Sequence, residues 1–235
     1  MKIVHALLLA ICLLAAVPAH AEDITYYIPF FQAGGSEWTG LSLYNPSTNK
    51  VENIIITVFD TAGNEIEKFN NVKVKSKGTF TQSLGVGTNT EGWIKVKTPK
   101  KLDCVCFIGD SSYPDYIYDI DVTQGTTSKV VFPHVAVDSI WDTFIKVCNP
   151  SDSKIKFHLK FRDSDGENQY SQDYEVKAKN SMTISVRELV DGSTWEDGSI
   201  YMYSDSGKFV AFGVYSSLET GGTSIAGIPP SNAQN

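Results

Sequence analysis

The chain has 235 residues, a formal net charge of −7, 42% hydrophobic residues and 11% aromatic residues. Such an acidic surface repels nucleic acid and anionic lipid, so neither is an expected partner. Three cysteines follow the first 21 residues, which excludes a disulfide-dense scaffold at this length.

The first 21 residues have the pattern of a secretory signal peptide. Lys2 gives a positive start, residues 3–17 form an apolar run, and Ala19-His20-Ala21 matches a small-x-small cleavage site. We therefore expect an exported mature chain of residues 22–235, located in the periplasm or outside the cell. No other long apolar run follows, so we expect no membrane insertion.

The mature chain shows strand patterns almost throughout and little helical periodicity. The alternation of apolar and basic residues over 155–162 is typical of a half-buried strand, and turns rich in Gly, Asn, Asp and Ser separate such runs. We predict two tandem antiparallel β-sandwiches of Ig-like type, over residues 22–124 and 125–230, followed by a flexible tail at 231–235. The expected strands are near 25–31, 39–44, 52–59, 66–74, 78–84, 91–97, 103–109 and 117–122, then 128–133, 142–148, 154–162, 169–176, 180–187, 198–204, 208–216 and 223–228.

An internal repeat supports two similar units. Asn45-Pro46-Ser47 returns as Asn149-Pro150-Ser151, and a strand that ends at proline, a tryptophan and a turn glycine surround each copy. Such self-similarity indicates a supersecondary unit used twice by internal duplication. Features common to both copies are expected to serve the fold, and features of one copy only are candidates for function.

The order Pro, Trp, Asn-Pro-Ser and Gly resembles a β-sandwich module found repeatedly in secreted bacterial proteins. The residues that carry the resemblance are Pro29, Trp38, Asn45-Pro46-Ser47 and Gly63, then Pro133, Trp141, Asn149-Pro150-Ser151 and Gly166. The resemblance spans nearly all of the mature chain. It implies fold and export, and it supplies no active site, because the family has no established activity.

Two aromatic sets stand where the copies differ. If Gly92 and Gly198 correspond, Tyr201 and Tyr203 point outward, with Trp195 in the preceding loop. Exposed flat rings hold sugars by stacking in many carbohydrate-binding modules, so these three residues are a candidate glycan site; isolated exposed aromatics without function are the alternative.

A second candidate is the loop predicted over 110–121. It gathers tyrosines, including Tyr116 and Tyr118, and four carboxylates whose oxygens could hold Ca²⁺. The alternative is a contact region between the two modules. The carboxylates are Asp110, Asp115, Asp119 and Asp121.

One strand of the first copy is apolar on both faces. Ile55 and Phe59 lie where the second copy has basic residues, so we expect the second copy, a loop or a partner chain to cover them. The oligomeric state stays open. Cys148 either pairs with Cys104 or Cys106 or remains, like them, a buried thiol.

No catalytic motif accompanies the two histidines of the mature chain, so we expect a protein without enzymatic activity and without a cofactor, calcium being the one candidate. The leading hypothesis is an exported structural or interaction protein that contacts another envelope protein. The second is a carbohydrate-binding protein that recognises a surface glycan.

Overall fold

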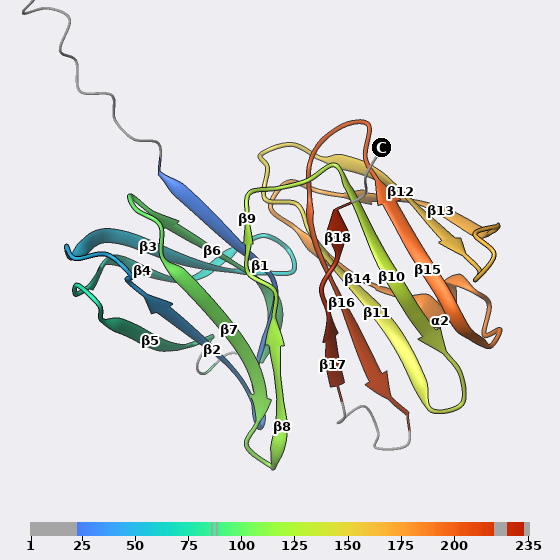
Figure 1. Cartoon of the computed structure of the whole chain (residues 1–235), viewed down its shortest axis with the longest axis horizontal. Helices are drawn as coiled ribbons and strands as arrows, with labels where there is room; N and C mark the ends of the chain where they lie inside the picture. Colours follow the sequence, from blue (N-terminus) through green and yellow to red (C-terminus); the bar gives the residue numbers. More distant parts are fainter. Residues whose placement is uncertain (1–22, 86, 88, 219–224, 233–235) are drawn as a thin grey trace, which may run out of the picture.

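The computed structural model describes residues 23–85, 87, 89–218 and 225–232, without the side chains of residues 114–116, 225 and 232. The predicted signal peptide lies outside these residues. The described chain is almost entirely antiparallel strand, arranged as two β-sandwiches side by side, which confirms the predicted fold class (Figure 1).

Each sandwich consists of a five-stranded and a four-stranded sheet. In the first sandwich the strand orders are β4-β3-β6-β1-β9 and β5-β2-β7-β8. Its strands are β1 (Ile24–Ala33), β2 (Glu37–Tyr44), β3 (Val51–Asp60), β4 (Glu65–Val74), β5 (Thr79–Leu84), β6 (Thr90–Thr98), β7 (Asp103–Asp110), β8 (Tyr113–Ile120) and β9 (Thr123–Gln124).

The second sandwich has the orders β13-β12-β15-β10-β18 and β14-β11-β16-β17, which correspond strand by strand to the first. Its elements are β10 (Lys129–Val137), β11 (Trp141–Cys148), β12 (Ile155–Arg162), β13 (Asn168–Val176), β14 (Ser181–Ser185), the short helix α2 (Val186–Leu189), β15 (Trp195–Tyr203), β16 (Val210–Ser217), β17 (Ile225–Ile228) and β18 (Ser231–Asn232).

Two predicted segments differ from the structure. The strand expected near 117–122 starts earlier, at Tyr113, so most of the segment 110–121, the predicted binding loop, is strand β8, which pairs with β7. Ser231 and Asn232, predicted to be flexible, form β18 and pair with β10, because the edge of that sheet offers unpaired backbone groups. Residues 233–235 lie outside the described part.

The Asn-Pro-Ser landmarks act within the fold. Asn45 Nδ2 donates hydrogen bonds to the carbonyls of Asn49 and Lys75, at 2.7 and 3.0 Å, and its Oδ1 accepts one from the Ser47 amide. Asn149 makes the matching bonds in the second sandwich. Both asparagines are fully buried, so each closes a loop whose backbone groups would otherwise lack partners.

The register corrects the match of the two tryptophans. Thr39 and Thr143 make the same hydrogen bonds and are therefore equivalent positions. The counterpart of Trp38 in the second sandwich is thus Asp142. Trp38 lies on the outer face of its sheet, over Gly40 and Gly109, where a Cβ atom at Gly109 would come within 2.4 Å of the ring. Trp141 therefore points to the opposite side of its strand.

Candidate functional site

The two sandwiches meet at an apolar contact built around Trp93. This side chain is fully buried and stacks on Phe59, with 4.3 Å between ring centroids. Cys148 and Val210 of the second sandwich complete the buried group, and Tyr27 packs beside it. We call these five residues the Trp93 cluster. It lies on the outer face of β1, β3 and β6 and is covered by the outer face of β11 and β16.

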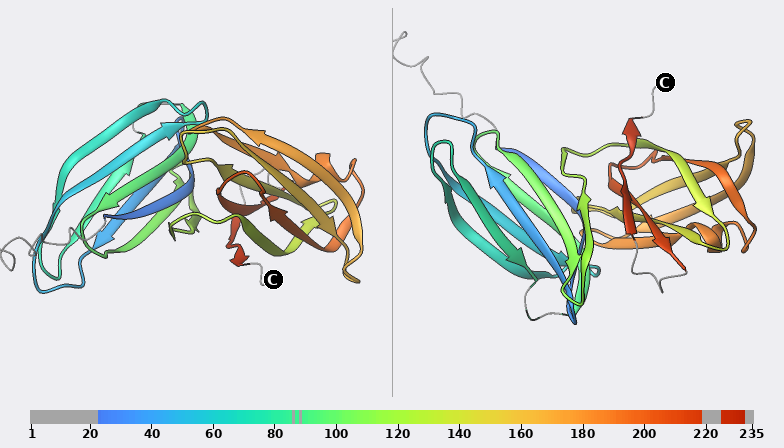
Figure 2. Two further views of the ribbon diagram at one scale, coloured as in Figure 1. Left: turned by 90° about the horizontal axis from the view of Figure 1, so that it is seen from above. Right: turned by 60° about the horizontal axis from the view of Figure 1, so that its bottom comes forward.

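A loop of the second sandwich fits onto a turn of the first. The carbonyl of Lys179 accepts a hydrogen bond of 2.7 Å from Trp93 Nε1, and the Ser181 amide donates one of 3.1 Å to the Thr61 carbonyl. Gly63 adopts a φ of +82°, and a Cβ atom there would lie 2.9 Å from Lys179. The turn therefore needs glycine for its backbone conformation and for the close approach. Figure 2 shows the resulting side-by-side arrangement.

A charged pair spans the same contact. Lys146 Nζ lies 3.3 Å from Glu91 Oε2 and 3.9 Å from the centroid of the Phe30 ring. Only 12% of the Lys146 side chain is exposed, and burial lowers the pKa of its amine. The pair lines a cleft of about 350 Å³ between the sandwiches, together with Tyr118 and Val214.

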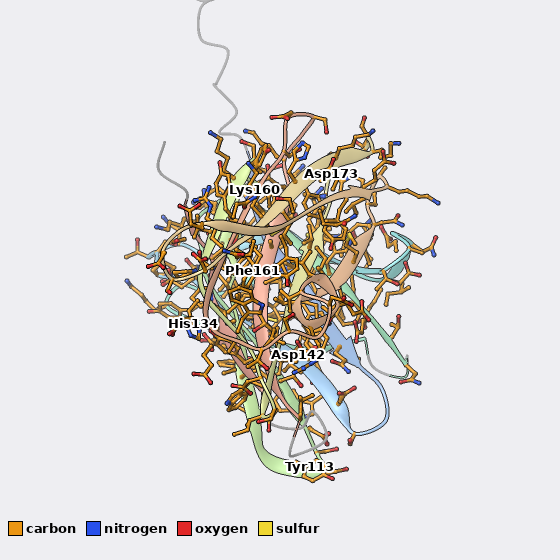
Figure 3. The ribbon with its side chains drawn as sticks, turned by 90° about the vertical axis from the view of Figure 1, so that its right-hand side faces the viewer. Tyr113, His134, Asp142, Lys160, Phe161 and Asp173 are labelled. Atoms are coloured by element: carbon orange, nitrogen blue, oxygen red, sulfur yellow. The ribbon has the colours of Figure 1, made fainter. Side chains whose placement is uncertain are left out.

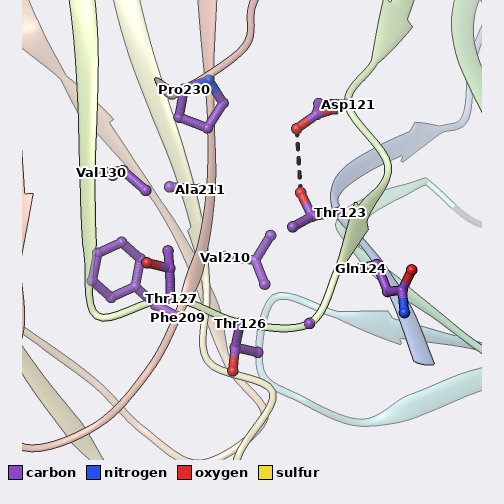
Figure 4. A pocket seen from close by; sticks show the side chains of 11 residues that line it. Asp121, Thr123, Gln124, Thr126, Thr127, Val130, Phe209, Val210, Ala211 and Pro230 are labelled. Atoms are coloured by element: carbon purple, nitrogen blue, oxygen red, sulfur yellow. Dashed lines mark hydrogen bonds between the residues drawn. The ribbon is translucent and has the colours of Figure 1, made fainter. Parts of the chain in front are cut away.

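A second hollow, of about 260 Å³, lies at the linker between the sandwiches (Figure 4). Asp121 accepts a hydrogen bond of 3.2 Å from the Thr123 hydroxyl there, and Phe209, Ala211 and Pro230 form the apolar wall. Its polar lining is mostly threonine and backbone, with Asp121 as the charged group, so it offers little to hold a ligand in place.

The outer face of β12 and β15 carries an aromatic and cationic surface. The rings of Tyr201 and Tyr203 stack at 5.4 Å, and His158 stacks on Tyr203 at 4.7 Å. Lys160 Nζ lies 5.3 Å from the Tyr203 ring, and the Arg162 guanidinium lies 5.3 Å from the Tyr201 ring. We call these five residues the ladder face. Figure 3 shows Lys160 on β12 and Asp173 on the neighbouring β13.

Trp195 does not join Tyr201 and Tyr203, contrary to the grouping expected from the sequence. Its ring packs edge-on against the buried Phe161 at 5.0 Å and against Tyr170 at 6.1 Å. The pairing of β10 with β15 is irregular between Val135 and Val137, and this shift turns Trp195 to the core side.

The predicted calcium ligands are not brought together. Asp110 pairs in register with Tyr113 at the start of β8, whereas Asp119 pairs with Phe107, three residues before Asp110 on β7, so the two carboxylates lie roughly 10 Å apart along the strands. Asp121 is used by Thr123. Among the described residues no group of three His, Cys, Asp or Glu side chains converges. The side chain of Asp115 lies outside the described part, as does that of Tyr116, whereas Tyr118 is buried and lines the cleft between the sandwiches.

The apolar stripe of β3 divides between two environments. Phe59 belongs to the Trp93 cluster and is covered by the second sandwich, and Ile55 lies four residues away and is partly exposed. Sequence reasoning missed Trp93 itself, because this residue has no aromatic counterpart in the second copy. Its alternation with Ile94 on β6 could have marked it as an outward, unpaired aromatic beside Phe59.

The histidines and cysteines are held within the fold. His134 is hydrogen-bonded to the Tyr215 hydroxyl and to the Glu196 carbonyl, and His158 lies 2.6 Å from Asp173. All three cysteines of the described chain are free thiols. Burial raises the pKa of Cys104 and of Cys106 to about 12, so both thiols stay protonated at neutral pH.

Comparisons with known proteins identify no family. No family model matches the chain, and no curated protein matches it. The solved structures that resemble it include the Anabaena sensory rhodopsin transducer, with 13% identity and a TM-score of 0.33 over 37% of this chain and 94% of that one. The PBSX exported protein XepA has 7% identity and a TM-score of 0.23 over 80% of each chain. A β-D-mannosidase from Dictyoglomus thermophilum has 9% identity and a TM-score of 0.21 over 73% of this chain and 25% of that one. Likenesses at these scores carry no functional argument. Within the described chain no helix is long and apolar enough to cross a membrane.

Proposed function

We propose that the protein is an exported, non-enzymatic interaction protein of the cell envelope or the surrounding medium. In this function the two sandwiches act as one rigid spacer, and an open sheet face makes the contact with a macromolecular partner. The observation that carries the proposal is the buried Trp93 cluster, which joins the sandwiches through apolar packing and a 2.7 Å hydrogen bond to Lys179. If the linker only tethered two independent sandwiches, the residues of the Trp93 cluster would be exposed to water.

Small-angle X-ray scattering tests the rigid-spacer function. The scattering curve of residues 22–235, extrapolated to zero protein concentration, should match that of one rigid body made of both sandwiches. Trp93→Ala should broaden the distribution of radii of gyration that is needed to fit the curve. A wild-type curve that requires independently moving sandwiches would contradict the proposal.

A second candidate function is the binding of an acidic glycan on the ladder face. Two stacked tyrosines offer a flat apolar platform, and Lys160 and Arg162 bring positive charge to a protein that is acidic overall. Rings of this kind bind the apolar face of a sugar, and adjacent cations attract its carboxylates or sulfates.

Binding to polygalacturonate and dextran sulfate, with neutral dextran as the comparison, tests this second function. Tyr203→Ala should weaken binding to the acidic polymers, and Tyr113→Ala, which removes an exposed tyrosine of the first sandwich, should not. Equal binding by both variants, or binding to none of the acidic polymers, would remove the ladder face as a glycan site.

A further inference from the structure

We propose that the contact joining the two sandwiches within one chain is repeated between chains, so that copies of the protein associate head to tail. This inference rests on the proposed interaction function and names its partner as a second copy of the same chain. It follows from the strand-by-strand correspondence of the sandwiches. Each sandwich has a surface equivalent to the one that its neighbour uses in the contact, and the described residues leave one such surface of each sandwich uncovered.

The first open surface is the outer face of β2 and β7, which we call the head face. The register makes Tyr44, Val105 and Phe107 equivalent to Cys148, Phe212 and Val214 of the second sandwich. The latter three are 0%, 2% and 3% exposed because the first sandwich covers them, whereas the former are 37%, 42% and 36% exposed. The head face is therefore an apolar surface at the same positions, which no sandwich covers in the described part of the chain.

We call the second open surface the tail face. It consists of the end of the ladder face that carries Arg162 and Tyr201, the neighbouring Ser199, and the adjoining turn around Gly166. Its residues Arg162 and Ser199 pair with each other across β12 and β15, as Phe59 and Trp93 do across β3 and β6. Tyr201 is likewise equivalent to Lys95. The adjoining turn glycine, Gly166, has a φ of +84° and no atom within 4 Å of a Cβ position. Its equivalent, Gly63, holds Lys179 at that place, so the receiving turn is formed and open.

The loop that would enter this turn is also preformed on the first sandwich. Lys77 has a φ of +53° and donates its amide hydrogen bond to the Ser47 carbonyl, as Lys179 does, with a φ of +62°, to the Ser151 carbonyl. Each lysine also donates a hydrogen bond from its amine to a proline carbonyl, Lys77 to Pro46 and Lys179 to Pro150. The head face therefore presents the same protruding loop that closes the contact within the chain.

The head face and the tail face carry opposite charges at positions where the contact within the chain is apolar. Val210 packs in the Trp93 cluster with Phe59, and the register replaces this apolar pair by Asp103 on the head face and Arg162 on the tail face. The two carboxylates Asp165 and Glu167 flank Gly166, where they would meet the loop that carries Lys77. Opposite charges at matched positions favour association of the two faces and fix its register.

The contact between chains is expected to be weaker than the one within the chain. The ion pair of Lys146 with Glu91 has no counterpart, because Ser42 and Asp197 occupy the equivalent positions. The two faces differ from each other, so the contact is heterologous and can continue from chain to chain into an open filament. Because charge pairs contribute, association should weaken as salt concentration rises.

Sedimentation velocity of residues 22–235 tests the inference. The mean sedimentation coefficient of the wild type should rise with protein concentration at low salt. Asp103→Arg and Arg162→Asp should each abolish that rise, and the double variant with both changes should restore it. Lys97→Asp makes the same charge change as Arg162→Asp on the outer face of the first sandwich, away from both surfaces, and should sediment like the wild type.

Circular dichroism spectra of the variants establish that each is folded before it is compared. A wild type whose sedimentation coefficient does not change with concentration would overturn the inference. So would association that persists in both single variants, because it would place the contact elsewhere. Either result leaves the rigid-spacer function intact if the scattering curve of the single chain is that of one body. Acidic-glycan binding that Tyr203→Ala removes, in a wild type whose sedimentation coefficient does not change with concentration, would assign the ladder face to the glycan instead.

Discussion

Replacement of Trp93 by alanine tests the connection between the sandwiches most informatively. The side chain is fully buried, stacks on Phe59 at 4.3 Å and donates a 2.7 Å hydrogen bond to Lys179. Substitution of a buried tryptophan by alanine costs about 3–5 kcal/mol, which is roughly a 10 °C fall in Tm for a cooperative unit of this size. The Trp93 cluster is separate from the main cores of the two sandwiches, so the loss should fall on the contact between them.

Differential scanning calorimetry measures this effect. The wild type should unfold in one transition, and Trp93→Ala should unfold in two, one for each sandwich. Trp195→Ala is the matched control, because Trp195 packs against Phe161 within the second sandwich. It should lower the Tm without splitting the transition. A single, unsplit transition in Trp93→Ala, together with an unchanged scattering curve, would show that Trp93 does not hold the two sandwiches together.

Two further predictions concern a turn and the buried thiols. Gly63→Ala should destabilise the protein by more than Gly166→Ala, because both substitutions cost about 1–2 kcal/mol for a positive φ but only the first adds a clash with the neighbouring sandwich; equal unfolding free energies in urea would contradict this. The raised pKa of Cys104 and Cys106, caused by burial, means that the folded chain keeps protons which the unfolded chain releases above about pH 9. The unfolding free energy should therefore fall as pH rises above 9, by about 1.4 kcal/mol per pH unit for each thiol, and Cys106→Ala should remove one such contribution; an unchanged slope in that variant would exclude the thiol as a cause.

Most of the architecture could be predicted from the sequence, because local residue patterns indicate the strands. The alternation over β12 predicts which of its residues are buried, and Phe157, Leu159 and Phe161 are indeed fully buried. The turns at Gly63 and Gly166 place glycine at a positive φ, and turn sequences such as Asp165-Gly166 indicate such a position. The repeated Asn-Pro-Ser element marks the same loop in both sandwiches, as its matching hydrogen bonds show.

Long-range placement could not be predicted in the same way. Trp195 belongs to the core because of an irregular pairing of β10 with β15, and nothing local to the sequence around 195 indicates that irregularity. The strand expected near 117–122 begins already at Tyr113 because β7 offers an unpaired edge, although the aspartates of the segment 110–121 favour a loop. The contact around Trp93 joins residues far apart in the chain, and only the arrangement of whole sheets brings them together.

The measurement that tests the head-to-tail contact most directly is sedimentation velocity of Asp103→Arg and Arg162→Asp, each alone and mixed in equal amounts. In the mixture the head face of the first variant, now basic, would meet the tail face of the second, now acidic, and the other two faces would keep their native charges. Each variant alone should sediment as a monomer, and the mixture should associate as the wild type does. A mixture that remains monomeric while the wild type associates would contradict the pairing of these two faces.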